Sequence, residues 1–144
     1  MGMIDVGTKP VVLREAEAEG TIRLRAETIE AIRSGDVRKG DPLVVAEVAA
    51  IQAAKQTSLV IPHCHQVPLD TVDAGFTVRS EGVTASCRVR AQARTGVEME
   101  ALVGVTAALN TIWDMVKYLE KDEAGQYPHT RIEEIRVVSK KKAG

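Results

Sequence analysis

Residues 95–117 read TGVEMEALVGVTAALNTIWDMVK, an apolar run with charged side chains near both ends. Thr95 and Glu98 have the spacing of a capping box, which predicts that a helix starts here and continues to Lys117. Polar side chains recur every three or four residues along the second half of this helix and therefore share one face. They are Thr106, Asn110, Asp114, Lys117 and Lys121.

Within this polar stripe, Asp114 and Lys117 form a candidate catalytic pair. A carboxylate and an ammonium one turn apart on a mostly buried helix can move protons, because burial and a charged neighbour both shift pKa values. The alternative is an ordinary ion pair on a solvated helix face. Such pairs are common, so the residues by themselves leave both interpretations open.

The bulk properties limit the classes of protein that this chain can represent. Its 144 residues have the size of one domain, and we expect a single catalytic domain over residues 1–144. The formal charge of −1 gives no overall basic field that would attract nucleic acid, so we expect no nucleic-acid partner. We expect no membrane association, because no run approaches the ~20 apolar residues of a membrane span. Two cysteines, Cys64 and Cys87, are too few for a disulfide framework and favour the reducing cytoplasm.

Hydrophobic periodicity divides the rest of the chain into predicted elements. Strands are predicted where apolar and polar residues alternate, and helices where caps and apolar runs coincide. The predicted order is a strand over 16–24, a helix over 26–33, a helix from an Asp41-Pro42 cap to Lys55, a loop over 57–68, a hairpin over 69–94 with its turn near Gly82, the long helix, a loop over 123–130 and a strand over 132–138.

This order predicts an α+β fold. If one helix is left out, the order of elements is the split βαβ pattern of a ferredoxin-like plait. This fold is an antiparallel sheet with helices on one face. We therefore expect that plait with one extra helix. Residues 1–13 suggest a mobile arm and residues 139–144 a basic tail. The outward face of the hairpin is rich in Arg and Thr, which are either solvated or bound to a second subunit.

The sequence His63-Cys64-His65 raises the question of zinc. Two imidazoles and a thiol are three ligands, but a structural zinc site usually needs four and typically with wider spacings. We therefore expect no metal. Anion binding is the other chemistry in view, because several cations stand near predicted turns or strand ends. They are Arg14, Lys39, Lys55, Arg94 and Lys140, each of which taken singly can also be an ordinary solvated side chain.

Five segments resemble the cyclic pyranopterin monophosphate synthase family. The longest is Thr-Gly-Val-Glu-Met-Glu-Ala-Leu at 95–102, followed by Asp-Met-x-Lys at 114–117. The others follow the order of the family and cover nearly the whole chain. They are residues 3–6 (MIDV), 39–41 (KGD), 51–55 (IQAAK) and 61–65 (IPHCH).

The resemblance implies a lyase of molybdenum cofactor biosynthesis. Such an enzyme converts a cyclised dihydro-GTP intermediate to cyclic pyranopterin monophosphate and releases pyrophosphate, without a cofactor. The resemblance implies catalytic roles for Lys39, Asp114, Lys117 and Lys140, with Lys141 or Lys142 as alternatives to the last. The resemblance implies that His65, Met99 and Glu100 contact substrate, with Cys64 beside His65. We add His63 and the cations Arg14, Lys55 and Arg94 as further substrate-binding candidates. Most members have Leu-Cys-His-Pro at 63–66, so His63 is an additional imidazole here.

The family also implies a homo-oligomer, a hexamer built as three dimers with the active site at a dimer interface. We expect Lys39 and Lys117 of one site to come from different subunits. The alternative function is a non-catalytic plait module that binds a nucleotide or assembles with itself, as the Arg-rich hairpin and the basic tail would allow. The Asp114/Lys117 pair argues against that alternative, since a binder does not need it.

Overall fold

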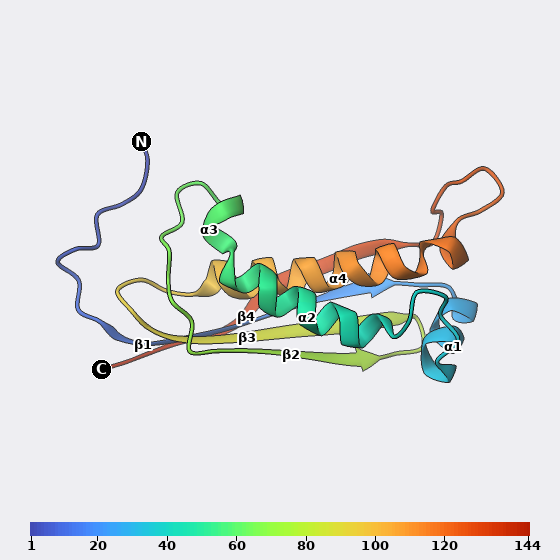
Figure 1. The fold of residues 1–144 in the computed structure, drawn as a ribbon, viewed down its shortest axis with the longest axis horizontal. Helices are drawn as coiled ribbons and strands as arrows, with labels where there is room; N and C mark the ends of the chain where they lie inside the picture. Colours follow the sequence, from blue (N-terminus) through green and yellow to red (C-terminus); the bar gives the residue numbers. More distant parts are fainter.

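The computed structural model describes all residues 1–144 and has four strands and four helices (Figure 1). In chain order they are β1 (Val12–Arg23), α1 (Ala26–Ser34), α2 (Pro42–Lys55), α3 (Thr57–Val60), β2 (Thr71–Val78), β3 (Gly82–Ala93), α4 (Glu98–Glu120) and β4 (Arg131–Ala143). None of the helices is long and apolar enough to cross a membrane.

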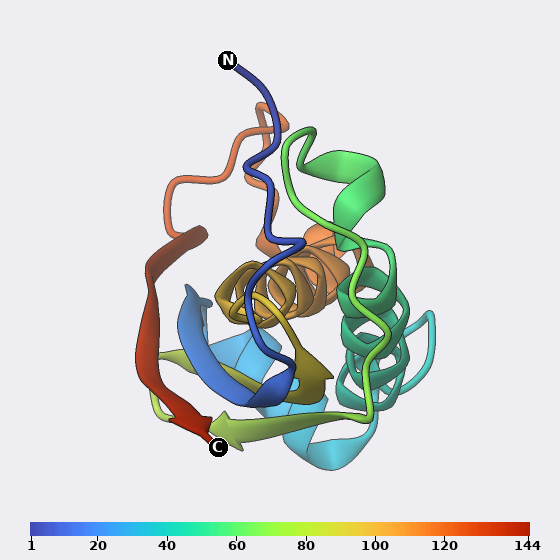
Figure 2. The ribbon, with the colours of Figure 1, turned by 90° about the vertical axis from the view of Figure 1, so that its left-hand side faces the viewer.

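The strands form one sheet in the order β2-β3-β1-β4, and each neighbouring pair is antiparallel. Helices α2 and α4 lie side by side on one face of this sheet (Figure 2). This confirms the predicted ferredoxin-like plait, with α1 as the extra helix. The short helix α3 was not predicted, and it begins the segment that was expected to be a loop.

The alternating strands bury the predicted faces. The inward side chains of β3, from Val83 to Val89 and on to Ala93, are buried, and those of β1 between Ala16 and Ile22 are buried opposite them. On the other face, Arg88 pairs with Glu17 at 3.0 Å and Arg90 with Glu15 at 3.2 Å. These two arginines of the hairpin therefore have carboxylate partners from the neighbouring strand of the same chain.

Helix α4 approaches the sheet closely because its inward face is built from small and aliphatic residues. Ala101, Val105, Ala108 and Leu109 are buried on this face. At Gly104 the approach is closest, since a Cβ placed there would lie 2.6 Å from Cys87 Sγ on β3 and 3.3 Å from the Ala50 carbonyl oxygen on α2. This glycine allows α4 to contact the strand and the other helix at once.

One predicted helix cap forms and the other does not. Asp41 caps α2, because its carboxylate accepts from the Leu43 N–H at 2.9 Å. The predicted capping box at Thr95 is wrong, since α4 has Val97 at its N-cap and no side-chain cap. The Glu98 carboxylate instead pairs with Lys140 at 2.7 Å, and a charged partner attracts a carboxylate more strongly than a neutral N–H does.

The two ends of the chain differ from the prediction. Strand β1 begins at Val12, inside the segment that was expected to be an arm, and β4 continues through the expected basic tail to Ala143. The extension is possible because Lys140 to Lys142 pair in register with β1, where Lys142 lies opposite Arg14. The basic tail is therefore an edge strand of the sheet.

We predict that Gly104→Ala lowers the free energy of unfolding by about 1–3 kcal/mol, because the added methyl group overlaps Cys87 Sγ. The measurement is chemical denaturation of four proteins: the parent, each single variant and Gly104→Ala with Cys87→Ala. If the overlap is the cause, Gly104→Ala costs less in the Cys87→Ala background than in the parent. Equal costs in both backgrounds would contradict this explanation.

Candidate active site

Asp114 lies between two lysines near the C-terminal end of α4. Lys117 Nζ is 3.1 Å from Asp114 Oδ1, and Lys39 Nζ is 3.2 Å from Asp114 Oδ2. Lys39 also donates to the main-chain oxygen of Asp114 at 3.2 Å. We call these three residues the Asp114 cluster. The turn before α2 and the polar stripe of α4 position them together.

The Asp114 cluster lies on the surface of the chain. The Asp114 side chain is 57% exposed, so burial contributes little to its electrostatics. Hydrogen bonds from Lys117 and Lys39, together with their charges, hold the pKa of Asp114 below its ordinary value. The expectation that burial on this helix would assist proton transfer is therefore wrong for the single chain. The hydrogen bonds and charges of the two lysines determine the lowered pKa of Asp114 instead.

Lys39 and Lys117 contact the same carboxylate within one chain. The single chain thus brings together two lysines that we expected to come from different subunits of one site. Sequence spacing gives no hint of this contact, because Lys39 and Asp114 are 75 residues apart. The turn before α2 brings them together.

A second group of candidates surrounds a cavity of about 450 Å³ at the other end of α4. The N-terminal segment forms one wall of this cavity with Ile4, Val6 and Lys9. The loop after α3 and the start of α4 form the others. The predicted residues that line it are His63, Cys64, His65 and Met99.

Two smaller cavities adjoin the same loop, and His65 borders all three. One of about 220 Å³ is lined by Lys55, His65 and Glu100, and one of about 240 Å³ is lined by His65 and Arg94. We call the three together the His65 cavities. Sequence reasoning missed Lys9, which carries no motif and lies in a segment without periodicity.

Glu100 is the most buried charged candidate, at 2% exposure. The Cys64 thiol donates to its Oε2 at 3.8 Å, while Oε1 has no hydrogen-bond partner. Burial, with a smaller contribution from the Glu98 charge, raises the pKa of Glu100. Burial and the nearby Glu100 also raise the pKa of Cys64, so this cysteine is held as a thiol that donates a proton.

The alternation of β4 distinguishes among the three terminal lysines. Lys140 points to the helical side of the sheet and pairs with Glu98, whereas Lys141 lies 4.0 Å from Glu15 on the opposite side. Burial alone would raise the pKa of Glu98, but the hydrogen bonds from Lys140 and from its own backbone outweigh it and lower the pKa.

Arg14 lies at the same end of the sheet as Lys140. It is buried, and it donates to the carbonyl oxygens of Ala93 at 3.5 Å and Arg94 at 3.4 Å. Arg14 therefore supports the segment that leads into α4. Together with Lys9, Lys55, Arg94 and Lys140, it makes this end of the chain rich in cations.

The Asp114 cluster and the His65 cavities lie toward opposite ends of α4. Glu98 and Asp114 are 16 positions apart, which corresponds to about 24 Å along a helix. One chain therefore does not bring all twelve predicted residues together. It brings three together at one end and nine at the other.

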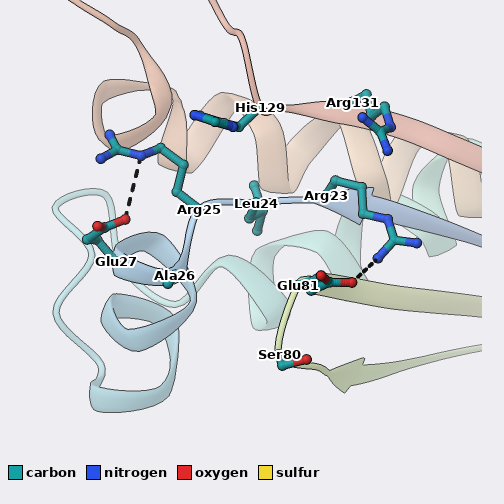
Figure 3. Close-up of a pocket in the computed structure, with 9 residues that line it drawn as sticks. All are labelled: Arg23, Leu24, Arg25, Ala26, Glu27, Ser80, Glu81, His129 and Arg131. Carbon is teal, nitrogen blue, oxygen red and sulfur yellow. Dashed lines mark hydrogen bonds and ion pairs between the residues drawn. The ribbon is translucent and has the colours of Figure 1, made fainter.

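A separate hollow of about 640 Å³ lies beyond the C-terminal end of β1 (Figure 3). It contains Arg23, Arg25 and Arg131 but none of the predicted site residues. Each of the three arginines is already paired with a glutamate: Arg23 with Glu81, Arg25 with Glu27 and Arg131 with Glu133. This hollow therefore offers no unpaired arginine to an anion.

The side chains of the His63–His65 loop border three cavities. No group of three or more His, Cys, Asp or Glu side chains lies close enough together to hold a metal ion. The side chains of the loop instead line cavities with cationic walls. One plait scaffold thus carries a pocket with a buried glutamate that accepts from a thiol and, separately, an aspartate held by two lysines.

The family is established by comparison with known proteins. Residues 3–143 match the model of the MoaC family, and the chain belongs to that family. A Pyrococcus abyssi relative named "Probable cyclic pyranopterin monophosphate synthase" is 56% identical over 96% of this chain and 87% of its own length. A Methanopyrus kandleri protein of the same name is 51% identical over 97% of this chain and 92% of its own.

A third relative carries a modified name. The Methanothermobacter thermautotrophicus protein is 54% identical over 97% of this chain and 88% of its own length, and it is named as a synthase accessory protein. Together with the family match, these relatives confirm the resemblance inferred from the sequence. The expected enzyme of molybdenum cofactor biosynthesis is thus confirmed at the level of the family.

We predict that Glu100→Gln raises the free energy of unfolding at neutral pH by about 1 kcal/mol, since it removes a buried charge with an unpartnered oxygen. Because burial raises the folded-state pKa, Glu100 favours folding in acid and loses that contribution as pH rises through the folded pKa. The gain from glutamine should therefore vanish below about pH 4.

Denaturation at pH 7.5 and pH 4 measures this difference. Glu123→Gln, on the exposed loop after α4, is the matched control and should change stability little at either pH. An equal effect of Glu100→Gln at both pH values would contradict the assignment.

Proposed function

We propose that this chain catalyses the reaction for which its relatives are named, the conversion of a cyclised dihydro-GTP intermediate to cyclic pyranopterin monophosphate with release of pyrophosphate. The observation that carries the proposal is Asp114 held between Lys39 and Lys117, on a chain of the MoaC family. A simple anion binder has no need of a carboxylate in its lysine cluster, because the carboxylate repels an anionic ligand.

The chemistry requires opening of the purine-derived ring, closure of the pyranopterin and attack on the innermost phosphate. These steps are proton transfers and displacements without net electron transfer, so we propose no redox cofactor. We assign Lys117 the role of general acid, since its ammonium is held 3.1 Å from Asp114 as a charged donor in the same cluster. Asp114 can accept a proton once substrate displaces a lysine or excludes water, because either change raises its pKa.

We propose that the cation-rich end of the chain holds the triphosphate. Arg14, Lys55, Arg94 and Lys140 supply positive charge near His65, and pyrophosphate departure concentrates negative charge there. Lys140 would exchange its Glu98 partner for a phosphate oxygen. His63, Cys64, Met99 and Glu100 would shape the cavity for the ring system.

A site complete with both groups requires two chains. We propose a homo-oligomer, a hexamer of three dimers, in which the Asp114 cluster of one subunit faces the His65 cavities of the next. The separation of the two groups along α4 supports this, and so does an apolar surface on α2 and α3. Val44 is 58% exposed and Leu59 is 75% exposed on that surface, which also includes Val45, Val48 and Val60.

The alternative is a non-catalytic nucleotide-binding or self-assembling plait, which the accessory name of one relative favours. The enzymatic proposal includes a single catalytic domain over residues 1–144. It also includes a location in the reducing cytoplasm, which suits the free thiols of Cys64 and Cys87. Pyrophosphate release from the substrate discriminates between the two functions, since a binding module releases none.

We predict that Asp114→Asn lowers turnover about 100-fold or more while the fold is kept, because the amide cannot accept the proton. The measurement is pyrophosphate release under saturating substrate. Asp36→Asn is the matched control, as Asp36 is exposed on the same turn as Lys39 and has no ion pair. Near-parental turnover by Asp114→Asn would exclude the proposed role.

We predict that Lys117→Ala and Lys140→Ala, each inactive alone, regain activity when unfolded together and reassembled. If the site is shared, random reassembly of equal amounts would give about a quarter of all sites an intact Asp114 cluster together with intact His65 cavities.

The pair Lys39→Ala and Lys117→Ala is the control, and it should stay inactive because both lysines belong to one chain's cluster. Recovery by the control pair, or none by the test pair despite proven subunit exchange, would reject this division of the site.

A further inference from the structure

Lys39 is carried by an exposed turn between α1 and α2. Gly35 and Gly40 flank it with φ values of 75° and 112°, conformations that favour glycine. Within the turn, Val37 is buried, whereas Arg38 and Lys39 are exposed. Holding a lysine on such a turn in one place costs side-chain conformational entropy. A contact that fixes the backbone beside the lysine reduces the freedom that must be lost.

Tyr118 supplies that contact from α4. Its hydroxyl accepts from the Arg38 backbone N–H at 2.8 Å, and the Arg38 guanidinium lies over its ring at 4.6 Å from the centroid. Tyr118 follows Asp114 by four residues and therefore lies one turn farther along the same face. Arg38 and Lys39 thus contact two successive turns of one helix.

We propose that Tyr118 is a positioning residue that holds the Arg38–Lys39 turn so that Lys39 Nζ meets Asp114. The hydroxyl fixes the backbone of the residue before Lys39, and the ring fixes the side chain of that residue. The Lys39 ammonium is then 3.2 Å from Asp114 Oδ2 without a search through other rotamers. The catalytic consequence rests on the proposed function, whereas the placement of Lys39 does not.

The first experiment tests placement without an activity assay. Trace acetylation of amines, followed by peptide mass spectrometry, compares the reactivity of Lys39 with that of Lys55 as an internal reference. Tyr118→Phe keeps the ring but removes the hydroxyl. We expect Lys39 to react about three- to tenfold faster, the size of the effect of one hydrogen bond.

Tyr127→Phe is the matched control for the labelling. Tyr127 packs edge-to-face on Trp113, with ring centroids 5.3 Å apart, and its ring contact is to α4 at a different residue. We expect no change in Lys39 reactivity in this variant. Tyr118→Ala removes both contacts and should raise Lys39 reactivity at least as much as Tyr118→Phe does.

The second experiment measures the consequence for catalysis. Tyr118→Phe should lower kcat about three- to tenfold with a smaller change in KM, because it affects a group of the Asp114 cluster and leaves the His65 cavities intact.

The outcomes separate the two ideas. Unchanged Lys39 labelling in a folded Tyr118→Phe protein overturns the positioning role, whatever the activity. Faster labelling in a parent protein that releases no pyrophosphate supports the positioning role and rejects the proposed function. Faster labelling with unchanged kcat and KM, in a parent protein that does release pyrophosphate, overturns the claim that Tyr118 serves turnover by placing Lys39.

Discussion

The close packing of α4 against β3 and α2 is the contact on which the rest of the structure depends. Gly104 and the neighbouring alanines let the helix lie directly on Cys87 and on the backbone of α2. Once that face is buried, the opposite face must point to solvent, and the polar stripe with Asp114 is turned outward. The start of the same helix borders the His65 cavities, so the length of α4 sets the distance between those cavities and the Asp114 cluster.

Two carboxyl groups on this helix show how placement decides chemistry. Glu100 is buried beside a thiol, and its raised pKa favours the protonated form. Asp114 is exposed between two ammonium groups, and its lowered pKa favours the charged form. In an isolated helix of the same sequence, Glu100 would lose its burial and Asp114 would lose Lys39 but keep Lys117, so only part of the Asp114 shift depends on tertiary structure.

Much of the fold follows from local patterns. The alternation in β1 and β3 records which side chains face the core, so the strands and their buried faces were predictable. The Asp41-Pro42 cap and the stripe on α4 were predictable for the same reason. The capping box at Thr95 was not, because its Glu98 has a stronger partner that approaches from β4. The short helix α3 carried no periodic signal at all.

The sequence by itself determined the plait, the faces of its strands, the polar stripe and membership of the MoaC family, because each is encoded by neighbours along the chain or by a continuous motif. Tertiary structure alone decided that Lys39 joins Asp114, that Lys140 rather than Lys141 faces Glu98, and that the predicted site residues divide between the two ends of α4. The physical reason is that these are contacts across the sheet and between helices. Their partners lie tens of residues apart, and only packing brings them within hydrogen-bond distance.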